Sequence, residues 1–566
     1  MKVIKRNGEL QEFDFQKIKS AIEKAFAATG RPGVPSILFE NIEHWFNLMA
    51  NGCDTITVEK IQDIVEKHLM FEKYFEVAKA YILYRAEHGE TRLLKERINY
   101  MMEYINSGDN AATSSEEDSN SNVTVKNVAN LNGEVYKNHN RRIQRMLMKN
   151  KLNELYPGED LGDQYIRDLE HHIIYTHDES SFPIPTNYCE AVSLYPLVLD
   201  GTSTMDGLRT TPPKNLTSFC GQLVNLTFLL AAQCKGAVAF GEFFNFFDYF
   251  CAKDFGVEYH KENHEKKIKQ AFQNIVYSWN QPAGNRSYQS PFININYFDS
   301  NYWNSMFKDF YFPDGSQPKW ERVDYLQRLF MKWFNAERKK TLLTFPVESM
   351  AMLTDGKDVI DQDYKNFTAK MWEEGHSFFV YLSDNADSLA SCCRLRNEVT
   401  NNEFSFTNGL TGIKTGSVNV ITLNINRIIQ DWYRMMDSNN KDWNKQKAID
   451  SLAIMSEYLI NILERVYKYH ISYKTMVYEL EKKGMLTAST AGYIDIRSLF
   501  STIGLNGLND AAEFLGIKCS NNEEYKNFVQ LITGTISEQN KKHSTKEFKF
   551  NQEFVPAEQL SSRNYN

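Results

Sequence analysis

The chain has 566 residues, and its 72 acidic residues outnumber its 64 lysines and arginines, which gives a formal net charge of −8. It contains no long lysine and arginine run, so binding to a nucleic acid polymer is not expected. With 42% hydrophobic residues, the composition is typical of a globular protein of about three domains, or of one large catalytic domain with smaller ones attached.

The most apolar stretch is residues 223–240, and polar residues such as Asn225 and Lys235 interrupt it. Polar residues also follow the basic start of the chain, so we expect a cytoplasmic protein without a membrane segment. The eight cysteines are widely spaced and include no C-x-x-C pair. A metal site made of this chain's cysteines is therefore not expected.

Residues 1–100 predict a small helical domain that carries a β-hairpin. Asn7-Gly8 lies between two short extended runs, which is typical of a two-residue hairpin turn. Asp14 can cap a helix whose apolar residues, from Ile18 to Phe26, share one face. Three further helical patterns cover residues 36–50, 58–70 and 73–104.

Residues 101–140 are expected to form a linker or a flap, because polar residues dominate from 106 to 132. From residue 141 to 566 helical and strand patterns alternate, which predicts a large α/β body, either an open sheet or a barrel. The helical patterns cover residues 215–236, 241–256, 260–280, 320–338 and 443–468, and the clearest strands cover 292–296, 344–347 and 418–423.

Two adjacent cysteines, Cys392 and Cys393, stand between Ser391 and Arg394. A neighbouring cation lowers the pKa of a thiol and favours the reactive thiolate, although most isolated cysteines are simply small buried hydrophobic residues. Adjacent cysteines do not readily form an unstrained disulfide with each other, so each would need its own partner or role.

Two other groups of residues suit a phosphorylated ligand. Lys5, Arg6 and Lys17 place three positive charges beside the start of a helix, where a triphosphate binds well. A solvated basic face is the simpler interpretation. Downstream, Gly416 and Ser417 belong to a stretch rich in glycine, serine and threonine that allows close approach of a ligand to the backbone. That stretch has neither P-loop nor G-x-G-x-x-G spacing.

Residues 1–95 resemble the ATP-cone, the allosteric nucleotide-binding domain of ribonucleotide reductases, through the V-x-K-R-N-G motif and the helix Tyr81-Ile-Leu-Tyr-Arg85. This resemblance implies that Lys5, Arg6 and Lys17 contact the phosphates of ATP and dATP as allosteric effectors.

The whole chain is similar to the catalytic subunit of anaerobic (class III) ribonucleoside-triphosphate reductases. Seven segments carry the similarity in chain order, and they begin at Pro185, Thr217, Gly236, Gln289, Ser391, Thr415 and Val555. The similarity implies a ten-stranded α/β barrel of the ribonucleotide reductase and glycyl-radical-enzyme type. It also implies reduction of ribonucleoside triphosphates by thiyl-radical chemistry, in a homodimer or higher oligomer.

The resemblance assigns roles to the cysteines. Cys393 is expected to carry the thiyl radical that removes the ribose 3′ hydrogen, with Cys392 as the alternative, and Cys189 to supply reducing equivalents or a proton at the 2′ position. Ser391, Gly416 and Ser417 are weaker candidates for substrate binding. The other cysteines after residue 200 lie in or beside apolar helical patterns and are expected in the core, and they are Cys220, Cys234, Cys251 and Cys519.

The sequence departs from the family after Val555-Pro-Ala-Glu558, because it contains neither the family's four-cysteine zinc site nor its R-V-x-G-Y-type motif. We therefore expect a truncated product or a split reductase. In the split case another polypeptide supplies the glycyl radical, a radical-SAM activase generates it, and zinc is not bound by this chain. The reductant, formate or a thiol carrier, stays open.

Two other functions remain as alternatives. The chain could sense ATP and dATP without catalysis of its own, but Cys189 and the Cys392-Cys393 pair have no evident use in such a protein. A cysteine hydrolase would need a histidine to activate its thiol, and none of the twelve histidines forms a recognisable companion motif.

Overall fold

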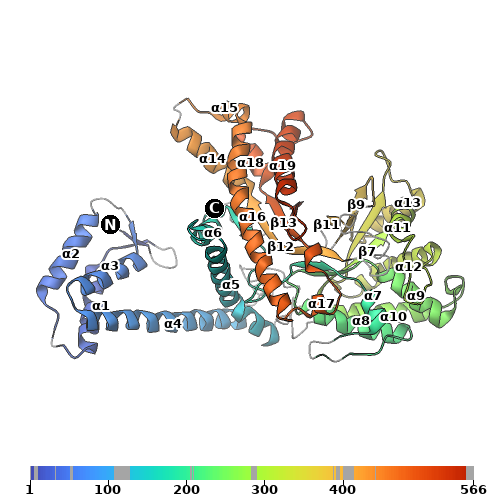
Figure 1. Cartoon of the computed structure of the whole chain (residues 1–566), viewed down its shortest axis with the longest axis horizontal. Helices are drawn as coiled ribbons and strands as arrows, with labels where there is room; N and C mark the ends of the chain where they lie inside the picture. The colour runs from blue at the N-terminus through green and yellow to red at the C-terminus, as the bar shows by residue number, and fades with distance from the viewer. Residues whose placement is uncertain are drawn as a thin grey trace. The chain divides into compact units, whose positions relative to one another are not determined.

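The computed structural model describes residues 2–4, 10–31, 33–50, 55–106, 128–203, 207, 209–281, 290–386, 388–390, 396–398, 414–439 and 442–555. The chain divides into two compact units, Met1–Ser107 and Gly108–Asn566, and each has its own hydrophobic core (Figure 1).

The N-terminal unit combines a small sheet with helices. Strand β1 (Lys2–Ile4) pairs antiparallel with β2 (Leu10–Glu12), which confirms the predicted strand pair, and the predicted turn residues Asn7 and Gly8 lie outside the described residues. Strand β3 (Thr55–Thr57) pairs parallel with β1 and was not predicted, because three residues are too few to show a periodic pattern. The helices of this unit are α1 (Phe15–Ala28), α2 (Ser36–Ala50), α3 (Val58–Phe71) and α4 (Phe75–Asn106).

A side chain caps helix α1 as the sequence predicts. The Asp14 side chain accepts a hydrogen bond from the Gln16 N–H at 3.0 Å, which begins α1. Ile18, Ile22 and Phe26 are buried along one face of this helix. The predicted amphipathic packing of α1 is therefore confirmed.

The larger unit is built on a curled sheet of nine strands in the described residues (Figure 1). Five strands, β5 to β9, run parallel to one another, and β12, β13 and β14 form a second parallel set. The two sets meet where β5 and β12 pair antiparallel, and β4 also pairs with β12. In spatial order the strands are β14 (Lys549–Phe554), β13 (Phe500–Asn506), β12 (Thr415–Asn424), β5 (Cys189–Ala191), β6 (Ala237–Phe240), β7 (Phe292–Phe298), β8 (Val347–Leu353) and β9 (Phe379–Ser383), with β4 (Ile174–Thr176) beside β12.

Helices connect most of these strands, so the predicted α/β class is confirmed, and the described residues form a curled nine-stranded sheet where a ten-stranded barrel was expected. A separate two-stranded hairpin, β10 (Ser388–Ala390) and β11 (Arg396–Glu398), precedes β12. The helices are α5 (Val128–Leu155), α6 (Leu161–Glu170), α7 (Tyr195–Asp200), α8 (Leu216–Ala231), α9 (Phe243–Phe255), α10 (Glu265–Trp279), α11 (Ser300–Phe307), α12 (Trp320–Arg338), α13 (Gln362–Glu373), α14 (Ile425–Asn439), α15 (Lys445–Asp450), α16 (Leu452–Lys482), α17 (Thr487–Thr490), α18 (Leu508–Leu515) and α19 (Glu523–His543).

Several predicted boundaries differ from the structure. The strand expected at 344–347 begins only at Val347, because Pro346 lacks the N–H that a strand ladder requires. The helix expected at 443–468 is interrupted at Ser451, which separates α15 from α16. Both ends of the expected 101–140 linker are helical, since α4 continues to Asn106 and α5 begins at Val128.

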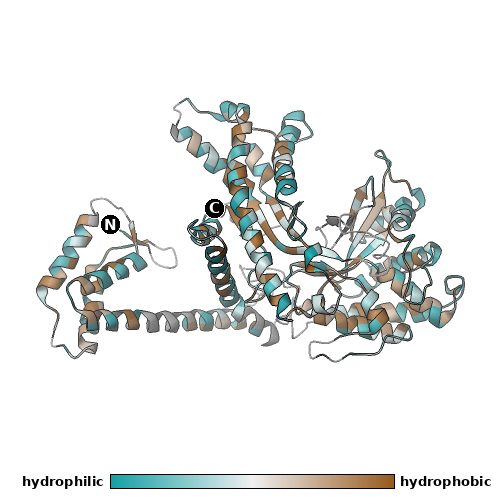
Figure 2. Ribbon diagram, in the orientation of Figure 1, coloured by the Kyte–Doolittle hydropathy of each residue, from teal (hydrophilic) through white to brown (hydrophobic). Residues whose placement is uncertain are grey.

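Aromatic side chains fill the core on the helix-covered face of the sheet. Helix α9 buries Phe243, Phe247 and Phe250, and Trp279 at the end of α10 packs against Phe243 with ring centroids 5.9 Å apart. In Figure 2 hydrophobic residues recur along these helices, between hydrophilic residues. This amphipathic pattern explains how the helices cover the sheet and still meet water.

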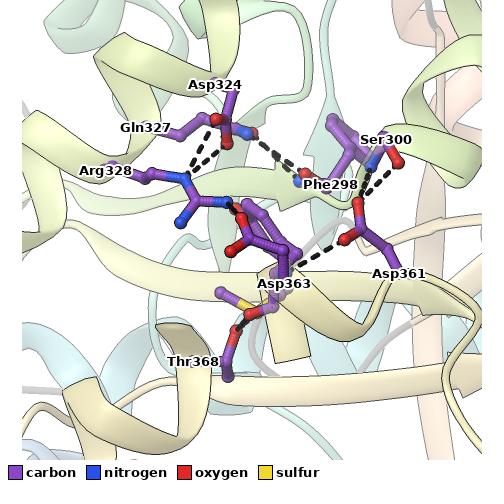
Figure 3. Close-up of polar contacts among 10 residues, drawn as sticks. Phe298, Ser300, Asp324, Gln327, Arg328, Asp361, Asp363 and Thr368 are labelled. Carbon is purple, nitrogen blue, oxygen red and sulfur yellow. Dashed lines mark hydrogen bonds and ion pairs between the residues drawn. The ribbon is translucent and has the colours of Figure 1, made fainter. Parts of the chain in front are cut away.

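Polar contacts also fasten α12 to the end of β7 and α13 to the middle of β8 (Figure 3). The Gln327 side chain on α12 accepts from the Phe298 N–H at 3.0 Å and donates to the Phe298 carbonyl at 3.1 Å. The Thr368 hydroxyl on α13 contacts the Met350 sulfur at 3.0 Å, and Arg328 binds carboxylates on both α12 and α13. These contacts hold β7 and β8 in a fixed position.

Within the described ranges, none of the helices has both the length and the apolar character needed to cross a lipid bilayer.

Candidate functional site

Cys189 lies at the centre of the sheet, as the first residue of β5. Its position is opposite Ser417 of β12, at the junction between the two parallel sets of strands. The side chain is buried, with 2% exposure, and its sulfur accepts a hydrogen bond from the Ala237 N–H at 3.3 Å. A buried thiol oriented by a backbone donor is well placed for chemistry away from water.

Two glycines make this position possible. A Cβ atom at Gly236 would lie 2.6 Å from the Cys189 sulfur, and one at Gly416 would lie 2.1 Å from the Cys189 carbonyl oxygen. Gly416 also has a φ of +147°, which favours glycine. Gly416, predicted as a weak substrate-binding residue, therefore allows β12 to approach the backbone of β5.

Ser417 is fully buried beside Cys189. Its hydroxyl lies 2.7 Å from the Thr502 hydroxyl, which in turn donates to Asn551 at 2.8 Å. The structure thus brings together three predicted residues, Cys189, Gly416 and Ser417, and the Ser417 hydroxyl is engaged by neighbouring strands.

The remaining predicted residues of the barrel site, Ser391, Cys392 and Cys393, lie outside the described residues. In the sequence they fall between β10 and β11, which pair antiparallel with Ala390 opposite Arg396. Strand β11 contacts β12, the strand that carries Gly416 and Ser417.

The other cysteines differ in their surroundings. Cys234 is buried, and its thiol donates to the Tyr188 carbonyl at 2.8 Å. Burial raises the pKa of the Cys220 thiol to about 12 and raises that of Cys251 well above its usual value. Cys519 is exposed, so its predicted place in the core is wrong: the chain turns into solvent after Ile517.

Of the predicted phosphate contacts in the N-terminal unit, Lys5 and Arg6 lie outside the described residues. Lys17 is exposed in the first turn of α1. Arg85, part of the helix that signals the ATP-cone, donates to Asp63 and Glu66 at 2.8 Å each and so ties α4 to α3.

Glu190 is a feature that the sequence reasoning missed. It is buried next to Cys189 in the chain, and one carboxyl oxygen accepts from the Asn187 amide at 2.7 Å. Burial raises the pKa of this carboxyl to about 7. Successive residues of a strand point to opposite faces, so Glu190 lies on the other face of the sheet from Cys189. The signal in the sequence that could have found Glu190 is a charged residue within a buried strand.

A curled sheet of two parallel sets, with a buried cysteine where they meet, defines an α/β protein of the half-barrel type. The family described as anaerobic ribonucleoside-triphosphate reductase matches residues 132–566, and the ATP cone domain matches residues 1–90. The chain therefore belongs to the anaerobic ribonucleoside-triphosphate reductase family.

Solved structures agree with this assignment. An anaerobic ribonucleotide reductase is 25% identical with a TM-score of 0.67, over 84% of this chain and 71% of that one. The Thermotoga maritima anaerobic ribonucleotide reductase with citrate in the active site is 26% identical with a TM-score of 0.63, over 78% and 77% of the two chains.

Curated relatives match parts of the chain. The anaerobic ribonucleoside-triphosphate reductase of Salmonella typhimurium is 22% identical over 54% of this chain and 42% of its own length. The ribonucleoside-diphosphate reductase subunit alpha of Chlamydia pneumoniae is 38% identical over 103 residues, which is 17% of this chain and 10% of that protein. The chain thus spans less than half the length of these curated relatives.

Proposed function

We propose that the chain is the catalytic component of an anaerobic ribonucleotide reductase, which replaces the 2′-hydroxyl of a ribonucleoside triphosphate by hydrogen. The observation that carries the proposal is the buried Cys189 thiol, held by the Ala237 N–H where the two sets of strands meet. A sulfur atom that is kept from bulk water can deliver a proton and electrons to a substrate without side reactions.

In this proposal Cys393, or alternatively Cys392, removes the 3′ hydrogen, and Cys189 acts at the 2′ position. The thiyl radical forms by hydrogen transfer to a glycyl radical, which a radical-SAM activase produces. ATP and dATP act as effectors through the cone, with Lys5, Arg6 and Lys17 at their phosphates, and the working form is a homodimer or higher oligomer.

The proposed reaction is tested by an anaerobic assay of the full chain with an activase, a polypeptide that carries a glycyl-radical motif, and either formate or a thiol carrier as the reductant. We expect deoxynucleotide formation and exchange of the substrate 3′ hydrogen with the complete mixture. Binding of ATP and dATP without either reaction would instead favour the alternative, an ATP- and dATP-sensing protein without catalysis.

A further inference from the structure

Lys474 of α16 is a fully buried lysine that forms no ion pair with a carboxylate among the described residues. Its Nζ donates to the Leu499 carbonyl at 2.7 Å. An ammonium group has three N–H donors, so this single bond leaves two of them to be satisfied. Buried charges in proteins are normally paired, because an unpaired charge loses the solvation of water without compensation.

The charged groups around Lys474 do not compensate its charge. Lys549 of β14 adds a second positive charge, whereas Asp495 and Glu547 oppose it. Asp495 is already bound to Arg497 at 3.1 Å, and Glu547 is exposed to solvent, which screens its charge. Burial lowers the pKa of the Lys474 ammonium to about 7. A further negative partner is therefore needed to keep this lysine fully charged at neutral pH.

Three other buried polar side chains lie between α16 and the sheet on which it packs. Asn419 of β12 is opposite Ser501 of β13, and Ser501 is opposite Phe550 of β14, so the three share a face. His470, one helical turn before Lys474, lies beside Phe550 with ring centroids 6.2 Å apart. The side-chain polar atoms of Asn419, Ser501 and His470 have no hydrogen-bond partner within the described part of the chain.

These groups are complementary to an anion. The Asn419 amide and the Ser501 hydroxyl supply N–H and O–H donors beside the lysine. Burial lowers the pKa of His470 to about 3, so its ring is neutral and adds one N–H without a charge. Each of these three side chains can also accept a hydrogen bond, but only Lys474 carries a charge. The uncompensated positive charge therefore favours a negative ligand over a neutral one.

A cavity beside α16 gives an ion a route to this interface. It has a volume of about 710 Å³, and Thr475 and Tyr478 of α16 line it together with Asp495 and Phe548. The Tyr478 ring, which forms part of its wall, has its centroid 5.7 Å from the Lys474 Nζ. Lys474 is therefore close to this cavity although its own side chain is buried.

We propose that Lys474 binds a small monovalent anion, such as chloride, between α16 and the strands β12 and β13. The Ser501 hydroxyl and the His470 N–H are its further donors, with the Asn419 amide on the neighbouring strand. A chloride ion is about the size of a methyl group, so the site requires little space. The anion neutralises the buried charge and ties α16 to the two strands.

Crystals of the full chain soaked in sodium bromide test the site directly, because bromide replaces chloride and scatters X-rays anomalously. We expect an anomalous peak at hydrogen-bonding distance from the Lys474 Nζ in the wild type and none at this position in Lys474→Met. Ser501→Ala keeps the charge and removes one donor, so its peak should be weaker. Water at this position without an anomalous signal in the wild type would overturn the proposal.

Amide hydrogen exchange, followed by mass spectrometry of α16 peptides, tests the same site in solution. Sodium chloride is compared with sodium gluconate at equal ionic strength, because gluconate is too large for a buried site. About 200 mM chloride should slow exchange around Lys474 about threefold, as a dissociation constant of about 100 mM implies. The difference should disappear in Lys474→Met and persist in Lys483→Met, which removes an exposed charge at the C-cap of α16. Equal exchange of the wild type in the two salts, or an undiminished chloride effect in Lys474→Met, would overturn the proposal.

Discussion

Gly236 lies so close to Cys189 that a single added carbon would collide with the thiol, at 2.6 Å from the sulfur and 2.8 Å from the Tyr188 carbonyl oxygen. The backbone oxygen cannot move away without disturbing the sheet. The position of the thiol is therefore set by a residue without a side chain.

We expect Gly236→Ala to shift the Cys189 thiol and to lower the free energy of unfolding by about 1–3 kcal/mol, as overpacking does. The rate of Cys189 alkylation, followed by peptide mass spectrometry, should change with it. Gly221→Ala is the matched control, because a Cβ at this exposed position of α8 meets nothing within 4 Å. Similar behaviour of the two variants would contradict the prediction.

The roles proposed for Cys393 and Cys189 predict different effects of replacing each of them. Cys393→Ala should abolish both deoxynucleotide formation and exchange of the substrate 3′ hydrogen, while substrate binding is nearly unchanged, since a reacting thiol contributes little to ground-state affinity. Cys189→Ser should stop repeated turnover but preserve the exchange. Full turnover by Cys393→Ala would move the role to Cys392, and loss of exchange in Cys189→Ser would contradict the division.

The buried Glu190 carboxyl predicts a pH dependence of stability. Its pKa rises from 4.5 to about 7 on folding, so between these values the folded state keeps a proton that the unfolded state has lost. Its contribution therefore disfavours the folded state increasingly as pH rises from 4.5 through about 7, by about 3 kcal/mol in total.

Glu190→Gln isolates this contribution, because the amide oxygen can still accept from Asn187 and no group titrates. Denaturant unfolding at pH 5 and pH 8 should show that the variant gains stability relative to wild type at the higher pH. Parallel pH profiles for the two proteins would show that Glu190 does not titrate in this range.

If the ATP-cone binds ATP as proposed, its contacts with the phosphates of ATP should depend on Lys17. Lys17→Ala in the full chain should weaken ATP binding by at least about tenfold, or 1.4 kcal/mol, if a charge-assisted contact is lost. Lys5→Ala with Arg6→Ala should act in the same direction. Lys24→Ala, at an exposed position of the same helix, should leave calorimetric titrations with ATP unchanged. Equal effects of Lys17→Ala and Lys24→Ala would indicate that the positive charge of the helix attracts ATP without a specific contact from Lys17.

Local signals in the sequence predicted local structure well. Asp14 caps α1, and the spacing of Ile18, Ile22 and Phe26 gave the buried face, because both depend on neighbours within one helix. The exposure of Cys519 was missed, since its surroundings depend on how the chain turns after α18.

The candidate site was only partly visible in the sequence. Motif order placed Cys189, Gly416 and Ser417 in one family pattern, but their register across β5 and β12 follows from the tertiary fold. The contact between Gly236 and the Cys189 sulfur depends on strand pairing as well. No periodicity within a single segment encodes such pairings.

The antiparallel pairing of β5 with β12 has a consequence for how the molecule folds. Most neighbours within each parallel set follow one another in the chain, whereas this pairing joins segments that are far apart in sequence and must close a long loop. We expect the two sets to form first and the junction last, so that the Tyr188 amide proton, which bonds to the Ser417 carbonyl across the junction, becomes protected late in pulsed hydrogen exchange during refolding. Early protection of this amide would contradict this order. The Cys189 thiol would then reach its final surroundings only in the last step of folding, and partly folded chains would carry this cysteine exposed to solvent.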